Sequence, residues 1–214
     1  MSIILVDPEV TRRKFQTELE LWRAHSLHRD RGWLLLGQDE ALPSAEIAFL
    51  AKVATSTGPG PLPVVVCAIR LTYDNYDLWP PSLTFIDIFS RKPSRPHVRA
   101  FVSTPEGPRD VLIDGHPTTN QPFLCLPGIR EYHSHPQHSG DDWLLHRPAR
   151  EGSLTNICER MWRLMTKNVV GLNVSVQALP VWPFRAQLII QIVQGEVDGS
   201  ALAASKASGP EQSK

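Results

Sequence analysis

The stretch 46-EIAFLAKVATSTGPGPLPVVVCAIRLT-72 contains two apolar runs joined by a link that no helix can cross. The link, STGPGPLP, holds three prolines and two glycines, which break regular structure and favour turns. The flanking runs are short and contain several β-branched residues, as strands do. The stretch therefore predicts two consecutive strands, Glu46–Ala54 and Val64–Thr72, joined as an antiparallel pair.

Further strands are predicted on both sides of this pair. Trp33–Leu36 precedes it, and Leu83–Phe89 follows the segment YDNYDLWPPS. Short sequential strands separated by turns favour an antiparallel meander. We expect a sheet of about four strands in sequence order.

A helix is predicted before the sheet. Asp7 can cap its first turn, and Pro8 suits the first helical position. Phe15, Leu19 and Trp22 recur at the spacing of one helical face and should pack on the sheet. Gly32 is a plausible end. The fold class expected is α+β.

The second half of the chain predicts a hairpin, an irregular region, a helix and more extended chain. The turn TPEGP lies between two strand-like runs, and a helical apolar stripe begins near Ser153. The tail beyond Val197 is small and polar, and we expect it to be disordered. The predicted segments are Arg99–Ser103 and Arg109–Ile113 for the hairpin, Gly115–Arg150 for the irregular region, and Leu172–Val193 for the extended chain, with a strand at Ala186–Val193.

The composition narrows the classes of function. The 214 residues include 22 acidic and 22 basic ones, which argues against a nucleic-acid-binding protein. No apolar run reaches the length of about 18 residues that a membrane helix needs. The start lacks the features of a secretory signal, and three cysteines without framework spacing favour reduced thiols, so we expect a cytoplasmic location. Cys67 and Cys158 fall within apolar patterns and are expected in the core.

The remaining cysteine, Cys125, opens the stretch 125-CLPGIREYHSHP-136, which contains the candidate catalytic or metal-binding residues. Glu131, His133 and His135 alternate along it and would share one face if the stretch were extended. With Cys125 they could fill a closed zinc site, or without it an open one. Alternatively, Cys125 is a nucleophile, and the acid and the imidazoles assist proton transfer.

A wider pattern resembles ubiquitin-conjugating enzymes. The segment YDLWPPSLTFID is similar to that family's Tyr-Pro-x-x-Pro-Pro-x-x-x-Phe motif before the fourth strand. In GHPTTNQPFLCL, His116-Pro117 precedes Cys125-Leu126 at nearly the distance of the family's His-Pro-Asn and Cys-Leu. Trp143 takes the place of the tryptophan that leads into the next helix.

The set Cys125, Glu131, His133 and His135 also resembles a bacterial family named for a Cys-Glu-His-His signature and found in ubiquitin-like conjugation operons. Together, the resemblances imply an N-terminal helix on the meander, a cysteine loop and a following helix. They imply a single domain over residues 1–196 with an insertion near 90–114, followed by the tail 197–214.

The implied activity is transfer of a ubiquitin-like modifier, received from an adenylating activating enzyme as a thioester on Cys125. Glu131, His133 and His135 would be catalytic helpers that orient or deprotonate the acceptor amine. This chemistry needs neither a cofactor nor a metal in the protein.

Two features depart from these families or favour another. The oxyanion asparagine of conjugating enzymes should fall at Thr118, with Asn120 two residues further on. The stretch HSHPQHSGDD also resembles the JAMM zinc peptidase signature, although Ser139 follows His135 too closely. The alternative function is therefore a zinc-binding, JAMM-like hydrolase or a zinc-stabilised binding module that uses Glu131, His133 and His135.

Overall fold

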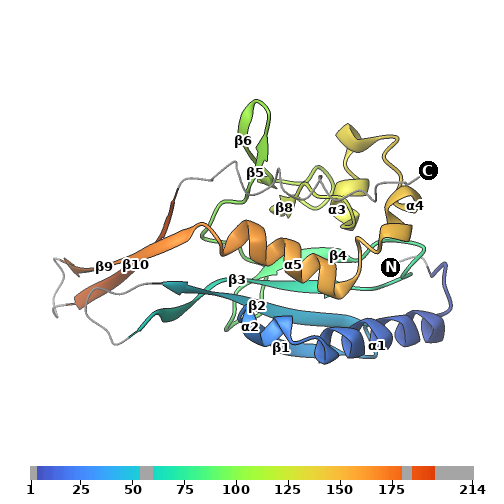
Figure 1. The fold of residues 1–214 in the computed structure, drawn as a ribbon, viewed down its shortest axis with the longest axis horizontal. Helices are drawn as coiled ribbons and strands as arrows, with labels where there is room; N and C mark the ends of the chain where they lie inside the picture. The colour runs from blue at the N-terminus through green and yellow to red at the C-terminus, as the bar shows by residue number, and fades with distance from the viewer. Residues whose placement is uncertain (1–3, 54–59, 180–184, 196–214) are drawn as a thin grey trace, which may run out of the picture.

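The computed structural model of the protein describes residues 4–53, 60–179 and 185–195. The predicted α+β class is confirmed: helix α1 precedes an antiparallel sheet in the order β1-β2-β3-β4 (Figure 1). The predicted tail, 197–214, lies outside the described residues, as does Ala54 at the end of a predicted strand. The four strands are β1 (Trp33–Asp39), β2 (Ser44–Val53), β3 (Leu62–Thr72) and β4 (Ser82–Ile86).

Helix α1 (Pro8–Ala24) begins where the sequence predicted. The Asp7 side chain accepts a hydrogen bond of 2.7 Å from the Glu9 N–H, which satisfies a free donor of the first turn. Phe15, Leu19 and Trp22 are buried, as their spacing indicated. A short helix, α2 (Leu27–Asp30), follows before Gly32, whose φ of +68° suits glycine and ends the helical segment.

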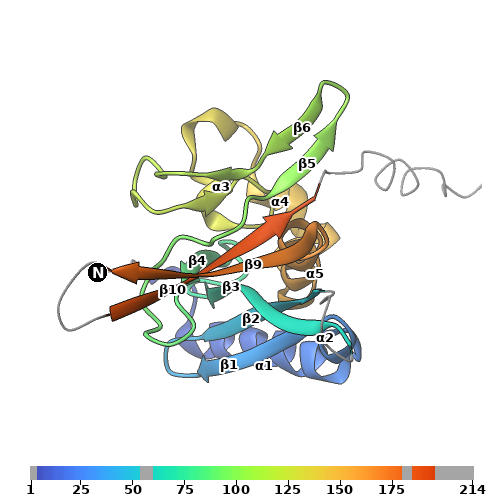
Figure 2. The same ribbon diagram turned by 90° about the vertical axis from the view of Figure 1, so that its left-hand side faces the viewer.

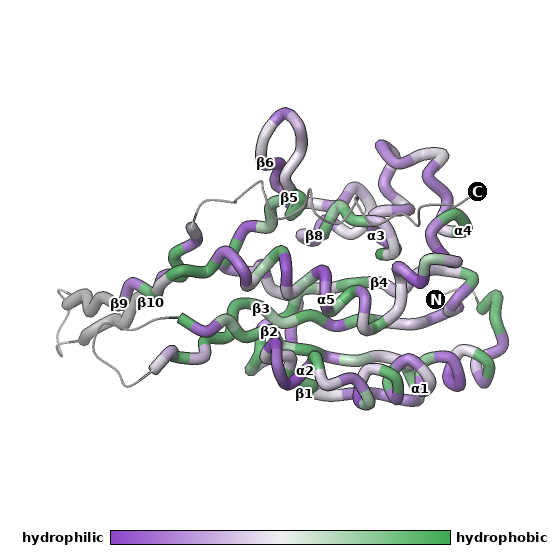
Figure 3. The backbone as a smooth tube through the Cα atoms, in the orientation of Figure 1, coloured by the Kyte–Doolittle hydropathy of each residue, from purple (hydrophilic) through white to green (hydrophobic). Residues whose placement is uncertain are grey.

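The sheet buries one face against α1 and α5 (Leu154–Met165), and Figure 2 shows both helices beside the sheet. Apolar residues follow β2 and β3, while α5 alternates between apolar and polar residues (Figure 3). Strand β2 contributes alternate residues Ala45, Ile47 and Phe49 to the core, all fully buried. The two central strands therefore form the base on which the rest of the domain packs.

Helix α5 confirms the amphipathic helix predicted near Ser153. The Ser153 hydroxyl accepts from the Asn156 N–H, and the apolar stripe is buried. Glu18 of α1 is also buried and joins the two helices. Its carboxylate accepts from the Leu154 N–H at 3.2 Å and from the Arg150 guanidinium at 2.9 Å. The N-terminus of α5 is thus held by a charge that its helix dipole favours.

Strand β4 is shorter than the predicted Leu83–Phe89. It stops at Ile86 because the Asp87 carboxylate accepts from the N–H groups of Phe89 and Ser90 and turns the chain. The predicted hairpin is present as β5 (Phe101–Thr104) and β6 (Gly107–Asp110). A separate short strand, β7 (Leu112–Ile113), pairs with β8 (Phe123–Leu124).

Apart from the short strand β8, the predicted irregular region Gly115–Arg150 consists of loops and single helical turns. These lie on the same side of the molecule as the β5–β6 hairpin in both Figure 1 and Figure 2. The extended conformation considered for Glu131–His135 is wrong, because α3 is helical and Pro136 then starts a 3₁₀ turn. The turns are α3 (Arg130–His133), η1 (Pro136–His138), α4 (Trp143–His146) and η2 (Arg147–Ala149).

The chain after α5 is extended, as predicted. Strands β9 (Val169–Leu179) and β10 (Arg185–Gln194) pair with each other in antiparallel register and form a separate two-stranded sheet among the described residues. This two-stranded ribbon extends beyond α5 at the left of Figure 1. In the parts of the chain that the structure describes, no helix has the length and apolar character to cross a membrane.

Substitution Glu18→Ala is expected to lower the free energy of unfolding by about 2 kcal/mol, because the Leu154 N–H loses a charged acceptor. Urea denaturation measures the change. The control is Glu20→Ala on the exposed side of α1, expected to stay within about 0.5 kcal/mol of the parent protein. Equal effects for the two variants would contradict the role given to Glu18.

Candidate functional site

Cys125 is the first residue after β8, and its backbone is fixed on both sides. Its N–H donates to the Val111 carbonyl at 2.8 Å, which extends the pairing of β7 with β8. The preceding residues, Phe123 and Leu124, are 1% and 0% exposed and anchor the strand in the core. Cys125 itself is only partly buried, whereas Cys67 and Cys158 are buried as predicted. Cys125 is therefore the accessible thiol among the three.

His138 lies against the thiol. Its Nε2 is 2.9 Å from the Cys125 Sγ. Burial raises the pKa of the Cys125 thiol, although the nearby charge of Arg109 opposes this. Burial, followed by the neighbouring His135, lowers the pKa of His138. Both shifts favour the neutral forms, a thiol beside an uncharged imidazole, and an uncharged imidazole can accept a proton.

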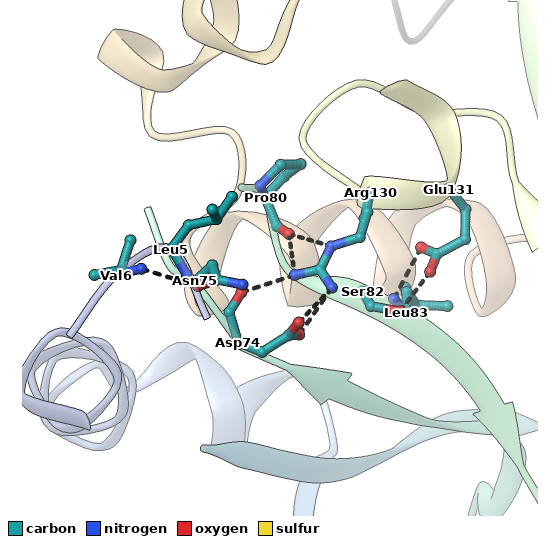
Figure 4. Close-up of polar contacts among 9 residues, drawn as sticks. All are labelled: Leu5, Val6, Asp74, Asn75, Pro80, Ser82, Leu83, Arg130 and Glu131. Carbon is teal, nitrogen blue, oxygen red and sulfur yellow. Dashed lines mark hydrogen bonds and ion pairs between the residues drawn. The ribbon is translucent and has the colours of Figure 1, made fainter. Parts of the chain in front are cut away.

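The Glu131 carboxylate is directed toward β4 instead of the thiol. It is 8% exposed, accepts from the Leu83 N–H at 3.0 Å and also accepts from the Ser82 hydroxyl (Figure 4). A buried carboxylate needs such partners, and here they also fasten α3 to the sheet. The structure thus gives Glu131 an anchoring geometry and does not bring it together with Cys125.

Arg130 provides a second anchor beside Glu131. Its guanidinium donates to both carboxylate oxygens of Asp74, at 2.8 and 2.9 Å, and to the carbonyls of Asp74 and Pro80 (Figure 4). It also lies over the Trp79 ring. The Pro-Pro segment that drew attention in the sequence therefore serves as the platform for the cysteine loop.

His133 also has a structural role, because both of its ring nitrogens are hydrogen-bonded to the backbone. Its Nε2 accepts from the Gly128 N–H at 3.0 Å, so its Nδ1 carries the hydrogen that is donated to the Asp141 carbonyl at 2.9 Å. Burial lowers the pKa of His133, which agrees with a neutral ring. Because both nitrogens are engaged, this imidazole ties the loop after Cys125 to the segment before α4.

His135 lies beside the site without touching the sulfur. Its ring stacks on Phe123, with centroids 5.4 Å apart, and is 5.7 Å from the ring of His138. Its Nδ1 accepts from the Gln137 N–H, which caps the 3₁₀ turn η1. This turn brings His138 round to Cys125. Of the three residues predicted as helpers, His135 comes closest to the reactive pair.

His116 of the predicted His-Pro pair is buried, and its ring contacts those of Phe123 and His135. Its Nδ1 accepts from the Thr118 N–H, and its Nε2–H donates to the Glu131 carbonyl at 3.0 Å. Asn120 has a left-handed φ of +53°, and its N–H donates to the His116 carbonyl. Thr118 and Asn120 both donate backbone hydrogen bonds to His116 and so form part of the turn before β8.

Several residues of the site were missed from the sequence. His138 is three residues beyond His135 and lies outside the set that alternates along an extended chain, so the predicted set did not include it. Tyr132, Asp141 and His146 form a connected polar group beside His138. The available signal was the density of histidine and acidic residues over HSHPQHSGDDWLLH.

A metal site receives no support from this geometry. Glu131 and both nitrogens of His133 are used in contacts that hold the fold. Within the described ranges, no group of three or more His, Cys, Asp or Glu side chains is arranged to hold a metal ion. The zinc alternative would require these side chains to leave their present partners.

Cys125 is expected to be the only thiol alkylated by iodoacetamide in the folded protein. The rate should rise with pH and reach half its maximum above the value of about 8.5 for free cysteine, because burial raises the thiol pKa. Peptide mass mapping across a pH series measures both points. Modification of Cys67 or Cys158 at a similar rate without denaturant would contradict this description of the three thiols.

Substitution Glu131→Ala is expected to lower the free energy of unfolding by about 3 kcal/mol, since the Leu83 N–H and the Ser82 hydroxyl lose a charged partner. Urea denaturation tests this, with Glu106→Ala in the exposed β5–β6 turn as the control. An unchanged unfolding midpoint together with altered Cys125 alkylation would show that the carboxylate acts at the thiol instead.

Comparison with known proteins identifies the family. The model of the Y4jH-like family matches residues 6–101 and 110–169, which leaves out most of the β5–β6 hairpin and the β9–β10 ribbon after its first residue. The chain is 33% identical over 198 residues to a protein of Sinorhizobium fredii (strain NBRC 101917 / NGR234) described as "Uncharacterized protein y4jH". The alignment covers 80% of this chain and 90% of that protein. The matched residues include the four-strand sheet, the cysteine loop and α5, and the chain belongs to the Y4jH family.

Proposed function

We propose that the protein is a conjugating enzyme that carries a ubiquitin-like modifier as a thioester on Cys125. The observation on which this proposal rests is the 2.9 Å contact between the Cys125 Sγ and the His138 Nε2. A thiol that is accessible and has a base in contact is the arrangement that nucleophilic catalysis requires. The other two cysteines lack the exposure for such a role.

The architecture supports the same proposal. An N-terminal helix, a four-strand meander, a Pro-Pro segment, a cysteine loop and a helix follow one another, in the order that resembles ubiquitin-conjugating enzymes. The Cys-Glu-His-His signature points to the bacterial group found in conjugation operons. The paired strands β9 and β10 stand where typical conjugating enzymes have two helices, so the resemblance concerns the part before them.

In the first step, the Cys125 sulfur attacks the carbonyl carbon of a modifier whose C-terminal glycine is a thioester on its activating enzyme. The thiol proton passes to the His138 Nε2, the new carbon–sulfur bond forms, and the activating enzyme's sulfur leaves and takes a proton. In the second step, an acceptor amine attacks the same carbon, and the Cys125 sulfur leaves. The nitrogen's proton is removed by His138 or solvent.

The predicted helpers take different parts in this proposal. His138, which the sequence did not single out, is the base. His135 flanks it, and Glu131 and His133 hold the loop in which the thiol lies. No cofactor or metal enters either step. The partners are a ubiquitin-like modifier, its adenylating enzyme and an acceptor amine in the cytoplasm.

A direct test uses a peptide that ends in Gly-Gly as a mercaptoethanesulfonate thioester, which supplies the reacting group without the natural modifier. Intact mass spectrometry should show one acyl adduct that dithiothreitol removes and that is absent in Cys125→Ala. The substitution His138→Gln should slow its formation about 100-fold, the usual scale for a lost general base. The control His97→Gln alters an exposed histidine outside the site and should leave the rate unchanged.

The same test addresses the zinc-dependent alternative. A purified protein with one tightly bound zinc per chain and no acyl adduct would overturn the proposal in favour of that class. An adduct of equal yield in Cys125→Ala would also overturn it, because the acyl group would then be on another residue.

A further inference from the structure

The partly buried Asp141 has several polar partners, and apart from His138 these do not act as acid or base in the proposed reaction. One carboxylate oxygen accepts from the Tyr132 hydroxyl at 2.6 Å, and the other is 2.6 Å from the His146 Nε2. Its carbonyl accepts from His133, and its N–H donates to the His138 carbonyl at 3.0 Å. One residue therefore joins α3, η1 and α4.

His146 lies between two carboxylates. Its Nε2 faces Asp141, and its Nδ1 is 3.1 Å from the Glu151 carboxylate. A protonated ring can donate to both carboxylates at once, because each ring nitrogen then carries a hydrogen. Hydrogen bonding to Asp141 raises the pKa of His146, which favours this protonated form. The neighbouring groups that face it are the His133 ring at 5.1 Å and, beyond Glu151, Arg160.

Tyr132 connects this ion pair to the reactive site. Its ring stacks on His138, with centroids 3.9 Å apart and an angle of 21° between the planes. Because the Tyr132 hydroxyl is bonded to Asp141, the plane on which His138 rests is fixed. The ring of His135 is also near His138, with centroids 5.7 Å apart. The direction of the His138 Nε2 toward the sulfur thus depends on Tyr132.

We propose that Asp141, held by His146, is a positioning residue that fixes His138 against Cys125 through the stacked ring of Tyr132. This inference rests on the role of His138 in the proposed function and extends it to residues that do not touch the reacting atoms. Misalignment of the imidazole weakens proton transfer from sulfur, while the thiolate formed at high pH does not need it.

The test measures the rate of Cys125 alkylation by iodoacetamide from pH 6 to pH 9.5, which requires neither modifier nor activating enzyme. At pH 7, Tyr132→Phe and His146→Gln should each lower the rate about fivefold, the effect of losing one hydrogen bond. At pH 9.5 the variants should approach the parent rate. Leu145→Gln, an exposed neighbour on α4, is the matched control and should have no effect.

A double-mutant cycle with His138→Gln separates positioning from a general structural role. In that background, Tyr132→Phe and His146→Gln should no longer change the rate at pH 7, because there is no imidazole to position. A fivefold loss that persists in the His138→Gln background, or an equal loss at pH 9.5, would overturn the inference. So would unchanged rates at pH 7. Failure of the acyl-transfer assay with this cycle intact would overturn the proposed function alone.

Discussion

The loop that follows Cys125 depends on the buried carboxylate of Glu131. This carboxylate is bonded to the sheet and not to the thiol. Glu131 accepts from the Leu83 N–H and the Ser82 hydroxyl, and the adjacent Arg130 grips Asp74 and the Pro80 carbonyl. Removing the carboxylate would leave an unpaired donor in β4, so the contact is strongly favoured once the chain folds. Both anchors fix the start of α3, from which the rest of the loop is built.

Beyond the start of α3, the loop is held mainly by its histidines, each of which has different hydrogen-bond partners. His116 supports α3 from below, and His133 ties Gly128 to Asp141. His146 lies between two carboxylates, and hydrogen bonding to Asp141 raises its pKa. Only His138 has a nitrogen against the sulfur. In the sequence, these histidines resemble a metal site. In the structure, each ring has its own partners, and the rings surround the pair Cys125 and His138.

The imidazole beside the partly exposed thiol is held by a stacked ring and by backbone contacts. His138 makes its contact with Tyr132 by stacking, and stacking fixes a plane more than a position. The backbone adds a second constraint, because the Asp141 N–H donates to the carbonyl of His138, the last residue of the 3₁₀ turn η1. The pKa shifts of Cys125 and His138 both favour the neutral forms, which in the proposed function would suit a nucleophile that reacts when a carbonyl is presented to it.

Much of the fold could be predicted from the sequence because its signals are local. The Asp7-Pro8 start, the stripe Phe15, Leu19 and Trp22, and the turn link 56–63 each act over a few residues. They led to α1 and to the meander with small errors at strand ends. Strand β4 is shorter than predicted because the Asp87 side chain accepts hydrogen bonds that turn the backbone. A pattern of apolar residues does not predict such a turn.

The sequence by itself also determined where the candidate site lies, since Cys125 and four of the histidines, at 133, 135, 138 and 146, fall within one short stretch. Only the tertiary structure decided which histidine meets the sulfur. Glu131 is 49 residues from Ser82 along the chain, and that contact directs its carboxylate to the sheet. Helix α3 and the turn at Pro136 then rotate the following side chains. Alternation along a strand and rotation around a helix place the same residues on different faces, so the partner of the thiol followed from the fold.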